Sequence, residues 1–364
     1  MKKTILFVTP GLGYGGAPKM LAALANHFAQ QGDKTYLFTY ENNVIRQTID
    51  DRLIHIKCKK NYKIRGLRRF LQILSIRAMI REKNPDVVIS FADYPNLLTL
   101  IATVGIKVPV IVSERGNPYS DNRGKMYKFN TFMYQFADGI VFQTEKAKDF
   151  FKSTIREKAA IIPNPVIVKN LPDRWTGERR DEIVSVGRFE LVTKRQDILL
   201  KAFKDVISDY PNIKLVFYGD GEDKDKIKNI ADELGITEHV IFAGVTDNVY
   251  ESIRYSRLFI LSSDSEGIPN ALIEAMSIGL PCISTDCSPG GARLLIDDMK
   301  NGIIVPCGDA EALAEAIIFL LNNDKKSEEF GIEAMKIIEK FEPRKIFKIW
   351  DTYIDEIIRG RGLV

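Results

Sequence analysis

The sequence alternates short apolar runs with amphipathic stretches, and it begins this alternation twice in the same way. The first half opens with an apolar run at residues 5–9, a glycine-rich turn and a helical pattern over residues 18–30. The second half opens with residues 183–187, a turn and a helical pattern over residues 196–208. Continuous apolar strands separated by helices are typical of a parallel sheet covered on both faces. We therefore predict an α/β chain of two doubly wound, Rossmann-like domains.

Further strand-like runs continue the alternation through both halves. They cover residues 35–40, 87–91, 108–113, 139–143, 214–218, 240–242, 258–261, 282–284 and 303–305. In an open parallel sheet the ligand binds at the carboxyl ends of the strands. Two such sheets facing across a cleft would carry their binding residues in the loops that follow the strands.

The boundary between the halves lies in residues 163–180, which are rich in proline and charge and have no clear period. Such a stretch is typical of an interdomain linker, and 364 residues are enough for two domains with cores of their own. We predict a first domain at residues 1–170 and a second at residues 171–342, followed by a last helical pattern within residues 343–364.

Charge is distributed unevenly between the halves. Residues 1–170 carry 27 Lys and Arg against 13 Asp and Glu, a net charge of +14, whereas residues 171–364 carry 25 against 35, a net charge of −10. The basic charge is concentrated in residues 59–81, where Leu67, Phe70, Leu71 and Leu74 recur at helical spacing. A basic amphipathic helix suits an anionic membrane surface. Its apolar stripe could equally pack on its own domain, with the arginines in solvent.

The usual signals of several protein classes are missing from this sequence. No apolar run reaches the roughly 18 residues of a membrane span, and residues 1–8 do not resemble a secretory signal. Cys58, Cys282, Cys287 and Cys307 have no metal-finger spacing, so we expect reduced thiols and a cytoplasmic protein. Only three histidines occur, and neither G-x-S-x-G nor H-E-x-x-H is present. We therefore expect no histidine-based hydrolase and no bound metal.

The first loop contains a glycine pattern with two interpretations. Gly11, Gly13 and Gly16 spell G-x-G-x-x-G between a strand and a helix. This pattern is typical of dinucleotide binding, and Glu41 near the end of the second strand could bind the ribose. An NAD-dependent dehydrogenase is therefore one interpretation, although the motif alone is weakly specific.

The most informative motif runs from Glu266 to Pro281. Its two acids, Glu266 and Glu274, stand eight positions apart where a loop enters a short helix, with Pro269 at the start and Gly279 at the exit. A helix rises about 1.5 Å per residue, so the acids can lie about 10 Å apart. One could bind the hydroxyls of a sugar and the other those of a ribose, with the phosphates at the helix N-terminus. This reach suits a nucleotide-sugar.

This run resembles the donor-site signature of the retaining glycosyltransferases of family 4, which have the GT-B fold. The resemblance implies donor contacts from Glu266, Glu274 and the positions between them. The intervening positions are Gly267, Ile268, Pro269, Asn270 and Ala271. It also implies that Gly15 and Gly16 let the backbone approach the donor diphosphate, and that the C-terminal helix packs back on the first domain.

Two cations extend the resemblance into the loop after residue 187. Arg188 and Lys194 match the family's Arg/Lys pair, and such a pair can stabilise the charge of a leaving nucleoside diphosphate without an obligatory metal. The catalytic residues implied are therefore Glu266, Arg188 and Lys194. One departure is Arg195, which stands where a glycine usually follows the lysine, so the path of this loop is left open.

The first domain departs from the family at the proposed acceptor side. The sequence Ser113-Glu114-Arg115-Gly116-Asn117 stands where many members have His-Asp after a strand, so the family's histidine contact is not carried over. A subgroup with Ser-Glu-Arg followed by Asn acts on polysaccharide intermediates and is similar to this chain. We expect acceptor contacts from Asp93, Glu114, Arg115 and Asn117.

These features predict a retaining, metal-independent hexosyltransferase that uses a nucleotide-sugar, with a UDP-sugar favoured, and a glycan hydroxyl as acceptor. The implied acceptor is a lipid-linked intermediate of capsule, exopolysaccharide or O-antigen synthesis, met at the anionic inner face of the cell membrane. We expect no cofactor, because the nucleotide-sugar is a substrate. Nucleic acid is not an expected partner, because it would leave the two glutamates without a purpose. A dehydrogenase and a catalytically silent GT-B binding protein remain as alternatives.

Overall fold

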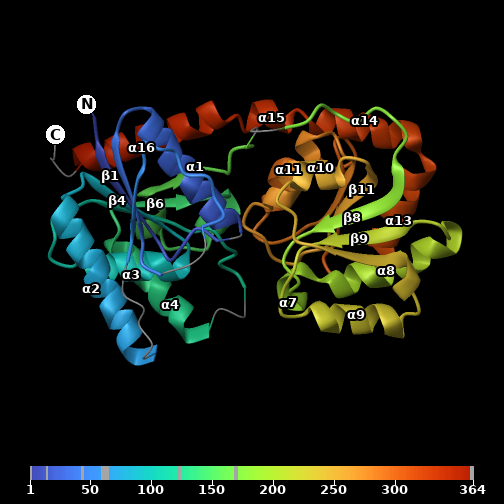
Figure 1. Cartoon of the computed structure of the whole chain (residues 1–364), viewed down its shortest axis with the longest axis horizontal. Helices are drawn as coiled ribbons and strands as arrows, with labels where there is room; N and C mark the ends of the chain where they lie inside the picture. Colours follow the sequence, from blue (N-terminus) through green and yellow to red (C-terminus); the bar gives the residue numbers. More distant parts are fainter. Residues whose placement is uncertain are drawn as a thin grey trace. The chain divides into compact units, whose positions relative to one another are not determined.

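The chain folds into two compact α/β units. The structure is a computed structural model that describes residues 2–13, 15–41, 45–58, 65–120, 124–167 and 171–360. Unit 1 consists of Met1–Pro165 together with Arg344–Val364, and unit 2 consists of Val166–Pro343. Figure 1 labels the helices and strands of both units.

Unit 1 is built on a seven-stranded parallel sheet in the order β3-β2-β1-β4-β5-β6-β7. The strands are β1 (Thr4–Thr9), β2 (Lys34–Thr39), β3 (Ile54–Lys57), β4 (Val87–Phe91), β5 (Val110–Ser113), β6 (Gly139–Phe142) and β7 (Ala159–Ile161). The central strands are apolar and almost wholly buried, as expected for a sheet covered on both faces. The strand order reverses between β1 and β4, which makes this position the topological switch point of the sheet.

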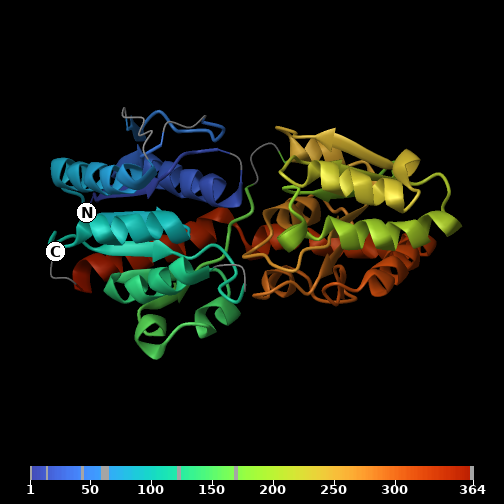
Figure 2. The same ribbon diagram turned by 90° about the horizontal axis from the view of Figure 1, so that it is seen from below.

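Helices cover both faces of the unit 1 sheet. They are α1 (Gly16–Gln30), α2 (Arg65–Lys83), α3 (Asp93–Thr103), α4 (Gly124–Met133) with the 3-10 turn η2 (Tyr134–Phe136), α5 (Glu145–Asp149), α6 (Ser153–Arg156) and α16 (Pro343–Gly360). α3 packs against both α2 and α4 on one face (Figure 2). The other face carries α1 and α16, which meet through stacked rings of His27 and Phe347.

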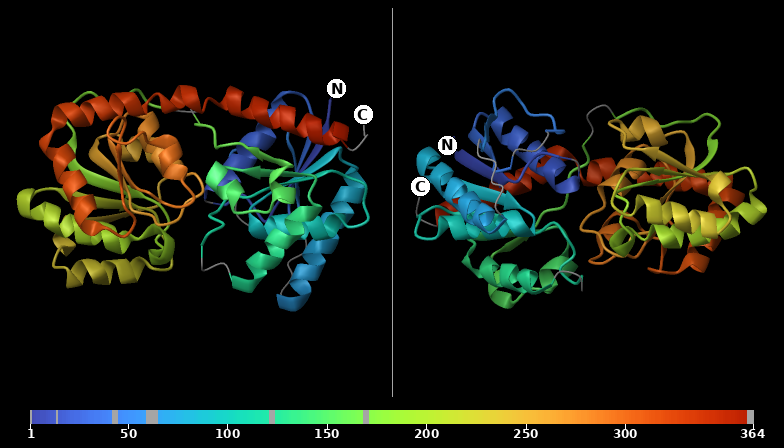
Figure 3. Two further views of the ribbon diagram at one scale, coloured as in Figure 1. Left: turned by 180° about the vertical axis from the view of Figure 1, so that it is seen from behind. Right: turned by 60° about the horizontal axis from the view of Figure 1, so that its bottom comes forward.

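The C-terminal helix α16 is an integral part of unit 1. Its buried residues Ile346, Trp350, Ile354 and Ile358 recur every four positions and form one stripe. The ammonium group of Lys3 donates to Asp351 at 2.5 Å and to Asp355 at 2.9 Å, which ties the helix to β1. Figure 3 shows α16 from behind, alongside the start of the chain.

Unit 2 repeats the same topology with six parallel strands in the order β10-β9-β8-β11-β12-β13. The strands are β8 (Arg180–Val186), β9 (Lys214–Tyr218), β10 (Val240–Gly244), β11 (Ser256–Leu261), β12 (Cys282–Thr285) and β13 (Ile303–Val305). The helices are α7 (Leu191–Lys194), α8 (Gln196–Asp209), α9 (Lys224–Glu233), η3 (Thr237–His239), α10 (Val249–Ile253), α11 (Asn270–Ser277), α12 (Gly291–Leu295), α13 (Ala310–Asn322), α14 (Asp324–Ala334) and α15 (Ile337–Lys340). The core joins α8, α9 and α13 to one face of the sheet. The switch point of unit 2 lies between β8 and β11.

The predicted fold class, two doubly wound α/β domains, is confirmed. Two strands, β3 and β7, were not predicted, and both lie at the edges of the unit 1 sheet. Their residues are partly exposed, so they lack the continuous apolar pattern of the central strands. Among the described helices, none has the length and apolar character needed to cross a membrane.

Candidate functional site

The residues predicted to act on the donor converge at the switch point of unit 2. β8 pairs with β11 through Ile183 with Leu258 and Val184 with Phe259, so the loops that follow these strands start side by side. The loop after β8 carries Arg188 and leads into α7, which ends at Lys194. The loop after β11 carries Glu266 and leads into α11. Ligands of open parallel sheets bind at this position.

Lys194 and Glu266 form a direct ion pair. Nζ of Lys194 lies 2.5 Å from Oε1 of Glu266, and both side chains are largely shielded from solvent. The hydroxyl of Ser263 donates to the same carboxylate oxygen at 2.8 Å. The hydroxyl of Ser262 donates to the backbone carbonyl of Lys194 at 2.9 Å, which holds the two loops together.

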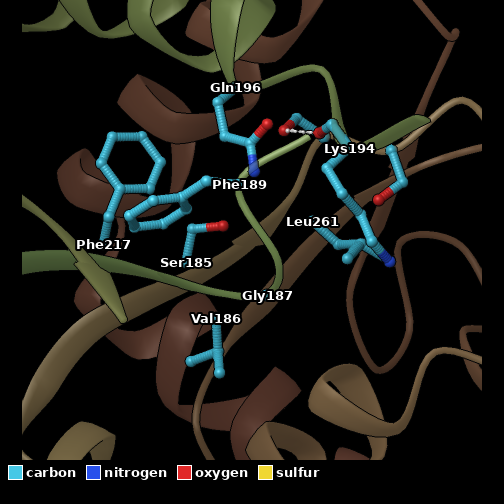
Figure 4. A pocket seen from close by; sticks show the side chains of 10 residues that line it. Ser185, Val186, Gly187, Phe189, Lys194, Gln196, Phe217 and Leu261 are labelled. Atoms are coloured by element: carbon cyan, nitrogen blue, oxygen red, sulfur yellow. Dashed lines mark hydrogen bonds between the residues drawn. The ribbon is translucent and has the colours of Figure 1, made fainter. Parts of the chain in front are cut away.

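Arg188 differs from Lys194 in being exposed. Within the described ranges its guanidinium makes no ion pair, whereas its backbone carbonyl accepts from Nε2 of Gln196 at 2.8 Å. Gln196 is buried, and together with Lys194, Ser262 and Ser263 it lines a small pocket that is partly open to solvent (Figure 4). The backbone of the loop is therefore fixed while its arginine is free to meet a ligand.

The loop that carries Glu266 packs tightly against the loop after β12. The amide of Glu266 donates to the carbonyl of Ser288 at 2.9 Å. A Cβ atom on Gly291 would come within 1.9 Å of the carbonyl oxygen of Gly267, so only glycine fits there. This close approach sets the path of the backbone into α11.

The second acid of the motif, Glu274, lies on α11. Pro269 is the N-cap of this helix, one residue before the first helical position that the sequence predicted for it, and Gly279 lies beyond the other end, as predicted, with a positive φ of 69°. The side chain of Glu274 is half-buried. Burial and then the charge of Glu274 raise the pKa of the nearby Tyr250 hydroxyl. Glu266 thus lies in the loop before α11 and Glu274 lies on α11, as the sequence predicted.

Arg195, which replaces the family glycine, has a left-handed backbone with φ 51° and ψ 44°. This conformation costs a non-glycine residue about 1–2 kcal/mol. Its guanidinium reaches Asp197 and Asp264, and the contact to Asp264 is 2.5 Å. No role could be predicted for Ser263, Asp264 or Gln196, because the contacts of Asp264 with Arg195 and of Gln196 with the carbonyl of Arg188 form only in the folded loops.

In unit 1 the first predicted loop and Asp93 both lie at the switch point between β1 and β4. Gly15 precedes α1 with a φ of 123°, and Gly16 is the first residue of that helix. Asp93 begins α3, directly after Ala92, whose φ of 76° and ψ of 160° fall in a region that only glycine adopts freely. Strain of this kind clusters at functional sites.

The other acceptor-side candidates are engaged within unit 1. The buried carboxylate of Glu114 accepts from the amide of Gly116 at 3.1 Å and from the hydroxyl of Tyr134 at 2.9 Å. Burial, and then the charge of Glu114, raise the pKa of Tyr134. Asn117 is also buried, and its Oδ1 accepts from the amide of Tyr119 at 3.0 Å.

Arg115 lies between aromatic rings instead of in open solvent. Its guanidinium carbon lies 4.0 Å from the centroid of Phe91 and 5.8 Å from that of Trp350. Nη1 donates to Oδ1 of Asn164 at 2.9 Å. Desolvation lowers the pKa of this guanidinium. Arg115 therefore links the ends of β4 and β5 to α16.

No group of three or more His, Cys, Asp or Glu side chains in the described part of the chain is arranged to hold a metal ion. All four cysteines are free thiols, and Cys307 is the exposed one.

Two family models match the chain, one in each half. Residues 14–169 match the model described as Glycosyltransferase Family 4. Residues 172–337 match the model described as Glycosyl transferases group 1. The two matches follow one another and cover most of the chain. The chain belongs to these glycosyltransferases, a retaining family with the GT-B fold, and it transfers a sugar from a nucleotide-sugar donor.

Individual proteins similar to this chain are also named as glycosyltransferases. An uncharacterized glycosyltransferase of Methanocaldococcus jannaschii is 31% identical to this chain over 258 residues. The matched region covers 64% of this chain and 63% of that protein's length. A Campylobacter jejuni protein named GalNAc-alpha-(1->4)-GalNAc-alpha-(1->3)-diNAcBac-PP-undecaprenol alpha-1,4-N-acetyl-D-galactosaminyltransferase is 27% identical over 97% of this chain and 98% of its own. The solved structure of Anabaena HepE with UDP-glucose has the same fold, with a TM-score of 0.81, 16% identity and coverage of 98% of this chain and 100% of that chain. The dehydrogenase interpretation of the first loop is therefore not retained.

Proposed function

We propose that this glycosyltransferase moves a hexose from a UDP-sugar to a hydroxyl of a lipid-linked glycan during synthesis of a cell-surface polysaccharide. The observation that carries the proposal is the meeting of Lys194 and Glu266 at the switch point of unit 2, 2.5 Å apart and next to α11. HepE with UDP-glucose supports a UDP-sugar donor. The name of the Campylobacter relative, which includes an undecaprenol-linked acceptor, supports a lipid-linked acceptor.

The donor contacts divide along the motif. Arg188 and Lys194 bind the diphosphate, Glu266 binds hydroxyls of the sugar, and Glu274 binds the ribose. The backbone of residues 267–271, where α11 begins, lies along the phosphates, because the free amides of a helix N-terminus favour anions. In unit 1, we assign Gly15 and Gly16, where α1 begins, to contacts with the diphosphate.

The reaction follows from these contacts without a histidine base. As the bond between the anomeric carbon and the phosphate oxygen breaks, Arg188 and Lys194 stabilise the negative charge that develops on the diphosphate. The acceptor hydroxyl attacks from the same face, and its proton passes to the leaving phosphate oxygen. The anomeric configuration is therefore kept, and the protein contributes orientation and charge stabilisation.

Unit 1 provides the acceptor side of this proposal. Asp93 is the candidate for direct contact, since it lies partly exposed at the start of α3 beside the strained Ala92. Glu114 and Asn117 are buried and shape the loop that carries Arg115. We thus assign direct contact to Asp93, whereas Glu114, Arg115 and Asn117 support the loop.

Exposed apolar and basic side chains on α2, α4 and η2 of unit 1 support docking on an anionic membrane. On α2, three of the four residues of the predicted stripe, Leu67, Phe70 and Leu74, are exposed, whereas Leu71 is half-buried, so most of the stripe does not pack on its own domain. A second exposed apolar stripe lies on α4 and η2, on the other side of α3, and it consists of Phe129, Phe132 and Phe136. Its residues have the same i, i+3, i+7 spacing, and this stripe was not predicted from the sequence. Exposed fractions of these six side chains lie between 43% and 58%.

Basic side chains flank these stripes. Arg68 and Arg69 of α2 and Lys128 of α4 are exposed, and Arg68 also pairs with Glu41 at 2.5 Å. Arg77 instead donates to the carbonyls of Ala102 and Val104 and is not available to a membrane. Lys59, Lys60, Lys63 and the side chain of Arg65 lie outside the described residues. Large apolar side chains rimmed by cations are typical of helices at a membrane interface.

A donor panel tests the proposed function. Thermal unfolding is followed with UDP-, GDP- and ADP-sugars, because a ligand at 100 times its Kd adds about 2.7 kcal/mol to the free energy of unfolding. We expect stabilisation by a UDP-sugar, followed by release of UDP when an undecaprenol-linked glycan is added. Stabilisation by a GDP- or ADP-sugar alone would overturn the choice of base. Donor binding without release of a nucleotide would support the silent alternative.

A further inference from the structure

Arg195 connects the two loops of the donor site by its side chain. Nε and Nη2 donate to the two carboxylate oxygens of Asp197 at 3.0 and 3.1 Å, and Nη1 donates to Oδ2 of Asp264 at 2.5 Å. A guanidinium that uses its planar fork in this way is firmly oriented. The hydrogen bonds to Asp197 and Asp264 raise the pKa of Arg195, so its charge is permanent.

The backbone of Arg195 does not explain why an arginine is there. Its left-handed φ of 51° and ψ of 44° favour glycine, or asparagine, over any long side chain. The ion pairs are what this residue adds over a glycine. These ion pairs compensate for the strained backbone conformation of Arg195. A strained residue persists only where the surrounding structure holds it in place.

Two ion pairs run between the same two loops. Lys194 pairs with Glu266, and the next residue, Arg195, pairs with Asp264, two positions before Glu266. The amide of Asp264 also donates to the carbonyl of Thr193 at 2.9 Å. Arg195 thus fixes the loop that carries Glu266 relative to the loop that carries Lys194.

Arg195 supplies part of the positive charge that balances the acidic residues around these two loops. Lys194 and Arg195 carry two positive charges, and Asp197, Asp264 and Glu266 carry three negative ones. Oδ1 of Asp264 is buried and has no hydrogen-bond partner among the described residues, so Arg195 is the cation that balances this carboxylate. Without Arg195, Lys194 alone would balance these three carboxylates, which lie beside the proposed diphosphate site.

We propose that Arg195 is a positioning residue of the donor site, which neutralises Asp264 and so makes the loops of Lys194 and Glu266 acceptable to the diphosphate of the donor. The inference rests on the proposed donor site in unit 2. It gives a role to the position at which this chain departs from the glycine of the family.

The test is a double-mutant cycle in the full-length protein, with UDP as the probe and calorimetric Kd as the readout. R195G relieves the backbone strain and is expected to fold, and R195N is a second variant that tolerates the same conformation. We expect R195G to raise the Kd of UDP about tenfold or more. D264N introduced together with R195G should restore most of the affinity, and R195K should lie in between.

Uridine, which has no phosphate, is the matched control ligand. If the effect is electrostatic, R195G should change the Kd of UDP and leave that of uridine close to its wild-type value. An unchanged Kd for UDP in both R195G and R195N would overturn the proposal. The proposal would also be overturned if D264N, combined with R195G, restored none of the affinity for UDP. A wild-type protein that binds no nucleotide would instead contradict the proposed function itself.

Discussion

The ammonium nitrogen of Lys194 lies 2.5 Å from Oε1 of Glu266, a separation across 72 positions of the chain. The two residues are the ones expected to act on the leaving phosphate and on the sugar, and their charges neutralise each other in this ion pair. In the proposed function the lysine binds the phosphate and the carboxylate binds sugar hydroxyls, so a bound donor would compete with this ion pair. Charge-assisted contacts on both sides would compensate for the loss of the ion pair.

Glu266→Ala should lower turnover and leave the affinity for free UDP unchanged or improved. The reason is that the substitution removes a sugar contact and at the same time releases Lys194 for the diphosphate. Steady-state kinetics and calorimetry on the same preparation would measure both effects, with E266Q as a control of similar size. Equal loss of affinity for UDP and for a UDP-sugar would contradict this division of labour.

Arg188→Ala and Lys194→Ala should each lower kcat by about 10²-fold or more, the usual effect of removing a preorganised group that stabilises transition-state charge. Lys201→Ala is a matched control, because Lys201 is exposed on α8 of the same unit. Activity should also persist in excess EDTA. A strict requirement for Mg²⁺ or Mn²⁺ would argue against the two cations as the groups that stabilise the leaving diphosphate.

The basic and aromatic face of unit 1 should bind vesicles that contain anionic lipid, and salt should release the protein. Each basic residue near the surface contributes about 1 kcal/mol. Replacing Arg65, Arg68 and Arg69 by Gln, or Phe129, Phe132 and Phe136 by Ser, should reduce co-sedimentation while turnover of a short soluble acceptor is retained. Replacing the lysines of α9 (Lys224, Lys226 and Lys228) is the control. No binding by the wild type at low salt would favour a soluble acceptor.

Cys307 should react slowly with iodoacetamide at neutral pH. Partial burial, followed by the charges of Asp264 and Asp286, raises the pKa of its thiol from 9.0 to about 11. Since the thiolate is the reactive form, the rate at pH 8 should be about 100-fold below that of an unshifted thiol. It should still rise tenfold per unit at pH 10. A rate that levels off near pH 9 would contradict the shift.

The fold and the two-glutamate motif could be predicted from the sequence because both depend on local pattern. Central strands are continuously apolar, and Pro269 and Gly279 mark the ends of α11. The Arg195–Asp264 pair could not be predicted, because its partners are 69 positions apart and meet only when β8 and β11 become neighbours. The exposure of the α2 stripe was likewise open, since helical spacing alone does not say which face a helix buries.

Binding of UDP to Glu274→Ala tests the central claim that the loops and helix α11 of unit 2 hold the donor nucleotide. Charge-assisted hydrogen bonds to the ribose are worth roughly 1.5–3 kcal/mol, which corresponds to a loss of about 10- to 150-fold in affinity. Glu315→Ala, on the exposed side of α13 in the same unit, is the control. We expect calorimetry to give one UDP per chain, a Kd raised by this factor in E274A, and an unchanged Kd in E315A. A correctly folded E274A protein that binds UDP as tightly as the wild type would contradict the account.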